Sequence, residues 1–306
     1  MDETQDLMLT RENFASLLTP IHRKIFFDSY REKPCQYDSI FKKDTMRAKQ
    51  VTFPHLGALG AWNKGTEGKV FNLSKFSEGA TATFIAERYD NSYKVTWELI
   101  QDDLYNVMKG YGRGGSAKGL GRGARTTEER KAADVILNGF TTAGYDGKAL
   151  FAEDHPLIDS TKTCSNLIEG VLTDANLKKA LTMLRKQVDE AGEIIDTHAT
   201  QLVVCPELEF TAKAIVNSIL QSGTNNNDVN TVPNLKIVVW DYLAHDTMRP
   251  WFVQDESYDN LTFLTRESVL FGSQFIPGQM DSLMYGYERF AVGYTDWRGL
   301  VGSKGV

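Results

Sequence analysis

Cysteine is scarce in this sequence. Among 306 residues there are three, Cys35, Cys164 and Cys205, and they lie far apart. No two of them form a C-x-x-C pair, and an odd number cannot pair completely. The sequence therefore predicts neither a zinc site nor a disulfide framework. We expect three reduced thiols in a protein that is made and kept in the cytoplasm.

Long apolar runs and an excess of positive charge are also missing. No apolar run approaches the roughly 18 residues that a membrane-spanning helix needs. The first residues, Met-Asp-Glu-Thr-Gln-Asp, lack the charged-then-apolar order of a signal peptide. A net charge of −6 argues against a protein whose main task is to bind nucleic acid. The remaining composition, 42% apolar and 24% charged, is typical of a globular protein.

Motifs that carry catalysis are weak. Gly110-Tyr-Gly112-Arg-Gly-Gly115 matches G-x-G-x-x-G, but a dinucleotide site needs a strand directly before this motif, and the preceding residues have a helical pattern. The acidic residues and the histidine between positions 146 and 159 fit neither an EF-hand nor a zinc-binding helix. Asp146-Gly147 instead predicts a hairpin turn, and Asp154-His155-Pro156 a turn with local hydrogen bonds. We predict no enzyme, no cofactor and no metal site.

The most informative stretch runs from Tyr93 to Pro156. Alternating apolar residues from Tyr93 to Leu99 predict a strand, and an apolar stripe from Ile100 to Met108 predicts a helix. A glycine-rich run, Gly110–Gly123, interrupts that helix. We expect the helix to resume after Thr126 or Thr127, with two glutamates in its first turn. The residues expected on its buried face are Ala132, Val135, Ile136 and Gly139.

Three pieces of this stretch carry a resemblance. In order they read ELIQDDL, AKGLGRGARTTEERKAADVILNGF and GYDGKALFAEDHP. They resemble the Mu-like group of major head (capsid) proteins of tailed bacteriophages, over roughly residues 51–303. The resemblance implies an α+β fold of the Hong Kong 97 type. It would divide the chain into an N-terminal arm (1–46), an extended β-hairpin loop (47–92), a peripheral domain with a broken spine helix (93–165), an axial domain (166–276) and a return strand of the peripheral domain (277–306).

The same resemblance implies a function. Such a protein assembles with copies of itself, through hexamers and pentamers, into an icosahedral shell that encloses packaged double-stranded DNA. Expected partners are portal, scaffold and decoration proteins, with DNA touched only non-specifically and no membrane. The protein would be assembled in the cytoplasm of a bacterial host and end in the capsid of the virion. Two alternatives stay open: an encapsulin-like compartment with the same fold, and a nucleotide- or metal-dependent enzyme that uses the Gly110–Gly123 run.

Two segments suggest contacts with other copies. Thr10 predicts the start of an amphipathic helix and Thr19-Pro20 the start of another, continuing to about Tyr30. This arm has little of its own to pack on, so it either lies across neighbouring subunits or packs back on its own domain. The glycine-rich run after Val51 contains leucines and a tryptophan, as an interface does. The alternative is a hairpin folded onto its own core.

The second half of the chain predicts alternating helices and strands. Thr173 is expected to cap a helix whose inner face consists of Leu177, Ala180, Leu181, Leu184 and Val188. A buried strand at Leu202–Cys205, a helix from Glu207 to Leu220, and strands at 235–240, 251–253 and 263–264 follow. The loop 222–232 is the expected rim of a ring. Met284 to Thr295 predicts a final strand with a bulge near Glu288-Arg289.

The candidate contact residues follow from these segments. On the arm and the extended loop they are Phe14, Leu18, Leu56, Leu59, Trp62 and Lys64; on the basic glycine-rich run, Arg113, Lys118, Arg122 and Arg125; on the rim, Asn225 and Asn226. For the basic run three partners stay open: acidic residues of a neighbouring subunit, DNA phosphates, or solvent alone.

Overall fold

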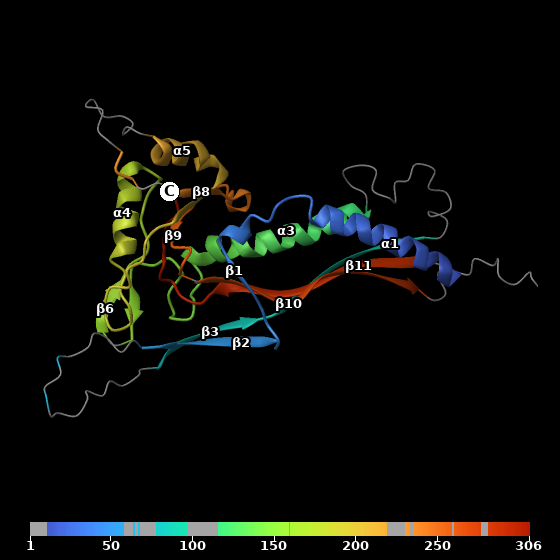
Figure 1. Cartoon of the computed structure of the whole chain (residues 1–306), viewed down its shortest axis with the longest axis horizontal. Helices are drawn as coiled ribbons and strands as arrows, with labels where there is room; N and C mark the ends of the chain where they lie inside the picture. The colour runs from blue at the N-terminus through green and yellow to red at the C-terminus, as the bar shows by residue number, and fades with distance from the viewer. Residues whose placement is uncertain are drawn as a thin grey trace, which may run out of the picture. The chain divides into compact units, whose positions relative to one another are not determined.

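The computed structural model describes residues 11–57, 64, 67, 78–96, 116–158, 160–218, 230–232, 235–258, 260–276 and 281–306 (Figure 1). The predicted helix from Ile100 to Met108, the first part of the glycine-rich run and most of the rim loop lie outside these residues. Among the helices within them, none is long and apolar enough to cross a membrane.

The chain divides into two compact units. Unit 1 comprises Met1–Cys35, Ala86–Arg130 and Thr265–Ala291, and unit 2 comprises Gln36–Ile85, Lys131–Leu264 and Val292–Val306. The boundary falls inside three elements, α3 (Ser116–Leu137), β10 (Leu261–Ile276) and β11 (Asp281–Tyr294). The five-segment division implied by the resemblance stays a prediction.

The long strands belong to a four-stranded sheet with the order β1-β10-β11-β4, where β1 is Lys42–Thr45 and β4 is Glu87–Val95. In unit 1, β11 pairs antiparallel with β4 in one continuous register, from Ser282↔Val95 to Phe290↔Glu87. The predicted bulge near Glu288-Arg289 is therefore wrong. Gly286 and Glu288 lie on the buried face of β11. Because neither residue is a large apolar one, the alternation of apolar and polar residues along this strand cannot be recognised from the sequence.

Strand β10 is much longer than the two-residue piece predicted at 263–264. It extends over 16 residues, from Leu261 to Ile276. The stretch Thr265-Arg266-Glu267-Ser268 is polar, with its first three residues half-buried and Ser268 exposed. A strand with one face open to solvent needs few apolar residues, so its pattern is weak in the sequence.

Helix α1 (Arg11–Tyr30) is continuous, with Pro20 inside it. The predicted second start at Thr19-Pro20 is wrong. Proline removes only its own N–H from the helix hydrogen bonds, and here the helix continues past it. Phe26, near the end of α1, is fully buried in a core with Val95, Leu120, Phe271 and Met284. This part of the arm packs on its own unit, contrary to the expectation of an arm with little to pack on.

Helix α3 begins at Ser116, well before the predicted start at Thr126 or Thr127. Gly119, Gly121 and Gly123 therefore lie inside the helix and do not interrupt it. At Gly121 a Cβ atom would collide with the carbonyl oxygen of Phe26 and the hydroxyl oxygen of Ser29. This glycine is needed because α1 approaches α3 closely. On the later part of α3 the predicted inner face is confirmed, with Val135 only half-buried.

Unit 2 contains a second four-stranded sheet, in the order β12-β9-β7-β8. All four residues of β7 (Gln201–Val204) are buried, as predicted for this segment. Strand β8 (Lys236–Val239) runs parallel to β7, and β9 (Trp251–Gln254) runs antiparallel to it. Strand β12 (Leu300–Ser303) pairs antiparallel with β9. Strands β12 and β8 therefore form the two edges of this sheet.

Two helices accompany this sheet (Figure 1). Helix α4 (Asp174–Arg185) contacts β12, and α5 (Glu209–Asn217) contacts β8. The predicted cap is confirmed, because the Thr173 side chain accepts a hydrogen bond from the Asn176 backbone N–H. Leu181, predicted to be buried, is only half-buried. On α5 the inner residues are Ala212 and Val216, with Ile215 half-buried.

Short elements complete the described chain. Strands β2 (Gln50–Leu56) and β3 (Glu78–Ile85) form a two-stranded antiparallel ribbon, and β5 (His155–Leu157) and β6 (Ser160–Cys164) form another. Single 3-10 turns lie at Tyr37–Ser39, Asn138–Phe140, Pro206–Leu208 and Asp241–Leu243. The predicted turn at Asp154-His155-Pro156 is wrong, since His155 begins β5 with a fully buried side chain.

Candidate assembly surfaces

The β2–β3 ribbon is only partly covered by its own chain. Along β2, exposed residues alternate with half-buried ones, and Leu56 at its end is 57% exposed. Near the end of β3, Phe84 is buried and meets Phe53 edge-to-face at 5.4 Å between ring centroids. The His55 ring stacks on Tyr145 at 4.3 Å. One part of the ribbon therefore packs on the rest of unit 2, while Leu56 at the end of β2 is exposed and available for contact.

The GYDGKALFAEDHP segment forms a tight turn. Gly147 has a left-handed φ of 78°, and the Lys148 backbone N–H donates to Asp146 Oδ1 at 3.0 Å. These observations confirm the predicted turn at Asp146-Gly147. After the turn, the buried His155 ring lies with Nδ1 2.6 Å from Asp146 Oδ2 and stacks on Trp297 at 4.3 Å. The histidine connects the turn to the end of the chain, which is a structural role.

A buried arginine holds the same region together. Arg298 is 2% exposed, and its Nη2 lies 2.9 Å from Glu190 Oε1. Its Nη1 lies 3.2 Å from Asp296 Oδ1. Asp296 also accepts hydrogen bonds from the hydroxyls of Tyr145 and Tyr258. Burial raises the pKa of both tyrosines, so they stay protonated and donate. In the described part of the chain, no group of His, Cys, Asp or Glu could hold a metal ion.

In unit 1 the basic residues of the glycine-rich run have acidic neighbours in their own chain. Arg122 donates two hydrogen bonds to the Glu32 carboxylate, at 2.9 and 3.0 Å, and Lys118 Nζ lies 3.9 Å from it. The bond from Arg122 lowers the pKa of Glu32. Arg125 pairs with Glu128 at 2.7 Å. Three of the four predicted basic contact residues are thus already matched within the chain, and Arg113 lies outside the described residues.

Two carboxyl groups meet in the buried part of unit 1. Glu128 on α3 is 6% exposed and Glu288 on β11 is 3% exposed. The Tyr30 hydroxyl donates to Glu128 Oε1 at 2.7 Å. Burial first, and then the negative charge of Glu128, raise the pKa of Glu288 to about 9. The raised pKa favours the protonated form of Glu288 at neutral pH. Sequence reasoning missed this pair, because nothing in the sequence brings the two positions together.

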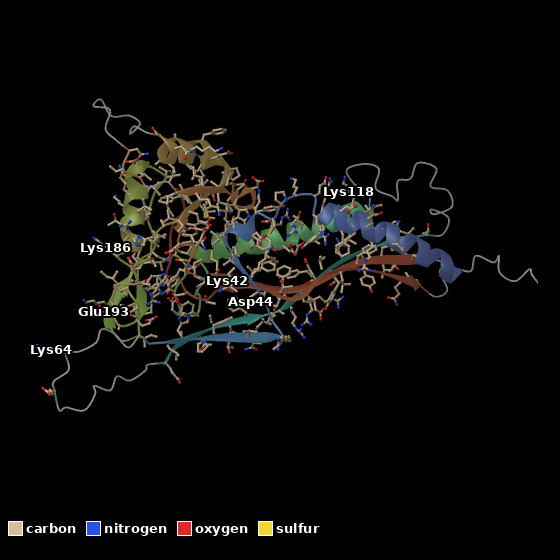
Figure 2. All side chains as sticks on the ribbon, in the orientation of Figure 1. Lys42, Asp44, Lys64, Lys118, Lys186 and Glu193 are labelled. Carbon is tan, nitrogen blue, oxygen red and sulfur yellow. The ribbon has the colours of Figure 1, made fainter. Side chains whose placement is uncertain are left out.

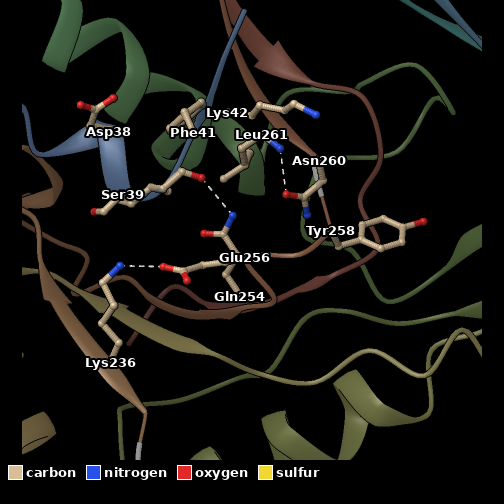
Figure 3. Close-up of a pocket in the computed structure, with 11 residues that line it drawn as sticks. Asp38, Ser39, Phe41, Lys42, Lys236, Gln254, Glu256, Tyr258, Asn260 and Leu261 are labelled. Carbon is tan, nitrogen blue, oxygen red and sulfur yellow. Dashed lines mark hydrogen bonds and ion pairs between the residues drawn. The ribbon is translucent and has the colours of Figure 1, made fainter.

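Unit 2 has a pocket of about 340 Å³ between the Asp38–Lys42 segment and the residues after β9 (Figure 3). Several of its polar groups bind one another. Gln254 Nε2 donates to the Ile40 carbonyl at 3.0 Å, and Lys236 pairs with Glu256 at 2.7 Å. The Leu261 backbone N–H donates to Asn260 Oδ1 at 2.8 Å. We find no nucleophile paired with a base among the residues that line this pocket.

A larger and more apolar groove lies along α4. Its volume is about 820 Å³, and segment 164–169 forms its other wall. Three lysines line it, Lys178, Lys179 and Lys186, and the last of these, directly after the end of α4, is labelled in Figure 2. The sequence did not single out this groove. The sequence feature that could have indicated the groove is the outer side of α4. This side combines lysines with Ala175 and Met183, whereas a fully solvated helix face is polar throughout.

The remaining predicted contact residues are distributed as follows. Phe14 and Leu18 lie on α1, in the part whose side chains are not described. Lys118, labelled in Figure 2, lies on α3 with Arg122 and Arg125. Lys64 is exposed, and Leu59, Trp62, Asn225 and Asn226 lie outside the described residues. The structure thus brings together only the α3 group, and contacts of all these residues with other copies stay a prediction.

Comparison with known families decides which family this is. A family model described as phage capsid protein matches residues 80–303. The chain belongs to the phage capsid protein family. This capsid protein is a structural protein of the virion, which agrees with the prediction that it is not an enzyme. No curated protein matches its sequence.

Solved structures agree on the fold. The capsid protein is similar to a chain of Microbacterium phage Oxtober96, with 15% identity and a TM-score of 0.54 over 89% of this chain and 92% of that one. It is similar to the capsid of cyanophage P-SCSP1u, with 13% identity and a TM-score of 0.60 over 89% and 88%. It also resembles a virus-like particle from Pyrococcus furiosus, with 11% identity and a TM-score of 0.52 over 94% and 99%. These similarities confirm the predicted fold of the Hong Kong 97 type.

Proposed function

We propose that this capsid protein is the major head subunit of a tailed bacteriophage of the Mu-like group. It assembles through hexamers and pentamers into an icosahedral shell around packaged double-stranded DNA. The observation that carries the proposal is the family match over residues 80–303, which includes strands of both units. The three sequence pieces between positions 98 and 156 support the Mu-like assignment.

The surface of the subunit fits this role. The β2–β3 ribbon leaves Leu56 and Ile85 more than half exposed. Apolar groups of this kind gain from being covered by another copy. A net charge of −6 suits a lining along which packaged DNA slides without being gripped. Portal, scaffold and decoration proteins are the further partners in this proposal, on the strength of the resemblance.

Electron microscopy of the purified protein tests the proposal. Negatively stained samples, prepared alone and with a co-expressed scaffold protein, should contain rings or closed shells. Analytical ultracentrifugation over a wide concentration range should show large species in the same samples. A protein that stays monomeric at high concentration, both alone and with the scaffold, would contradict the proposal.

An encapsulin-like compartment is the second candidate, because the similarity to the virus-like particle covers 94% of this chain. The fold does not separate the two functions. Neighbouring genes for terminase, portal and protease would favour a phage head, and enzyme cargo inside purified particles would favour a compartment. The enzyme alternative loses its basis in the described residues, since Gly119, Gly121 and Gly123 lie within α3 and form no phosphate-binding loop.

A further inference from the structure

The first observation is the groove along α4. Leu167, Ile168, Ala175 and Met183 supply its apolar lining. Lys179 and Lys186 are exposed, Lys178 pairs with Asp174 at 2.8 Å, and Glu169 also lines the groove. Pockets that bind molecules have volumes of about 300 to 1,000 Å³, and this groove has about 820 Å³. The groove therefore suits an apolar side chain with negative charge beside it.

The second observation is Phe210, in the first turn of α5. It is 79% exposed, more than any other large apolar side chain in the described residues. The buried face of α5 consists of Ala212 and Val216, so Phe210 points away from its own core. Glu207 is exposed just before it, and Glu209 is half-buried and pairs with Lys213. An exposed aromatic ring that follows the exposed carboxylate of Glu207 matches the apolar lining and the lysines of the groove.

The two surfaces belong to opposite edges of one sheet. Helix α4 contacts β12 and α5 contacts β8, and these strands are the two ends of the order β12-β9-β7-β8. Phe210 and the groove are thus carried by elements that contact opposite edge strands of the sheet. A second copy can offer its Phe210 to the first, and its own groove stays open for a third. Contacts between different patches of this kind close into rings.

We propose that Phe210 of one subunit inserts into the α4 groove of the next subunit in the ring, with Glu207 beside the groove lysines. The occupant of the groove is therefore a second copy of this chain. This inference rests on the proposed function, because it specifies one contact of the assembling subunit. Central aromatic residues in such contacts carry a large part of the binding energy.

The first test replaces the aromatic ring. Phe210→Asp should raise the concentration for half-maximal assembly, followed by light scattering, roughly tenfold or more. The circular dichroism melting curve of the monomer should not change, since the side chain is exposed. The matched control is Ile194→Asp at a residue that is 70% exposed, and it should assemble as the wild type does. Equal assembly of Phe210→Asp and the wild type would overturn the contact and leave the proposed function standing.

The second test exchanges charges across the contact. Glu207→Lys and Lys179→Glu should each weaken assembly, and the two together should restore much of it. Additive weakening in the double variant would overturn the contact.

A third test mixes Phe210→Asp with Met183→Asp. The mixture retains one usable contact per pair, so ultracentrifugation should show dimers and no rings. Rings in this mixture would contradict the contact, and a wild type that never assembles would overturn the proposed function as well.

Discussion

Gly121 shows how a single missing side chain positions two helices. Its Cα faces the Phe26 carbonyl and the Ser29 hydroxyl of α1, with no space for a Cβ atom between them. Gly119 and Gly123 belong to the same helix, but a Cβ atom on either would meet nothing within 4 Å. Gly121 is therefore needed for the packing of α3 on α1, whereas Gly119 and Gly123 affect only the intrinsic helix propensity of α3.

Substitution by alanine tests this difference. Gly121→Ala should lower the free energy of unfolding by about 1–3 kcal/mol, because the contact with α1 must open. Gly119→Ala should raise it by roughly 0.5–1 kcal/mol, because alanine restricts the unfolded chain and favours the helix. Urea denaturation of the two variants measures both effects. A stabilised Gly121→Ala protein would show that α1 does not pack on α3 at this point.

Glu288 is the second residue whose surroundings make a prediction. It is buried against Glu128, which also receives the Tyr30 hydroxyl and the Arg125 guanidinium. Arg125 lowers the pKa of Glu288, but burial and the Glu128 charge outweigh it and raise the value to about 9. An acid with a raised pKa in the folded protein holds its proton there after the unfolded chain has released it. Stability from this group is complete below about pH 4.3 and is lost as the pH rises toward 9.

Glu288→Gln should remove that pH dependence. Glutamine keeps the shape and can donate to Glu128, but it cannot ionise. The variant should be more stable than the wild type at pH 8.5 and about equally stable near pH 4.5. The wild-type free energy of unfolding should fall between these values by at most about 1.4 kcal/mol per pH unit from this group. Parallel pH profiles of the two proteins would refute the protonated state of Glu288.

At the scale of elements, α4 is the helix whose interior is best defined. Its cap at Thr173 is formed, and Leu177, Ala180 and Leu184 are fully buried while Leu181 is half-buried. Leu184→Ala should therefore lower the free energy of unfolding by about 2–5 kcal/mol. Leu181→Ala, the matched control with the same loss of atoms, should lower it by clearly less. Thermal and urea unfolding of both variants provide the comparison, and equal losses would contradict the assigned inner face.

The same helix explains what the sequence can predict. A cap followed by an apolar stripe is local information, and both are present for α4. Strand β7 is equally clear, since four successive apolar residues, Leu202–Cys205, precede Pro206. The start of α3 is not clear, because Gly121 reflects contact with a helix about a hundred positions earlier in the chain. Tertiary contact has overridden helix propensity there.

The candidate surfaces also differ in whether local sequence or only the fold reveals them. The exposed end of β2 was predictable from Leu56 next to a glycine-rich run. The α4 groove was not, because its two walls are formed by segments that only the fold brings together. The Arg298 cluster was missed for the same reason. A buried arginine is recognisable only when its acidic partners Glu190 and Asp296 are placed around it.

At the scale of the whole molecule, function depends on surfaces that other copies cover. Leu56→Asp should weaken assembly, because a charge would enter an apolar contact, while monomer stability should change by less than about 0.5 kcal/mol. Light scattering and monomer melting curves together measure the two effects. His55→Ala serves as a comparison, since it removes the stacking on Tyr145 within the chain and should affect the melting curve. Normal shells from Leu56→Asp would exclude the end of β2 from the shell contacts.

The open β2–β3 ribbon has one further consequence. An isolated two-stranded ribbon is only marginally stable in water, and here alternate residues of β2 have no cover from their own chain. When another molecule binds through the ribbon, part of the favourable binding free energy is offset by the entropy lost in ordering the ribbon. Each such contact is then weak and easily reversed when it stands alone. A subunit added in the wrong place can leave again, and mistakes in a growing lattice are corrected before many contacts make them permanent.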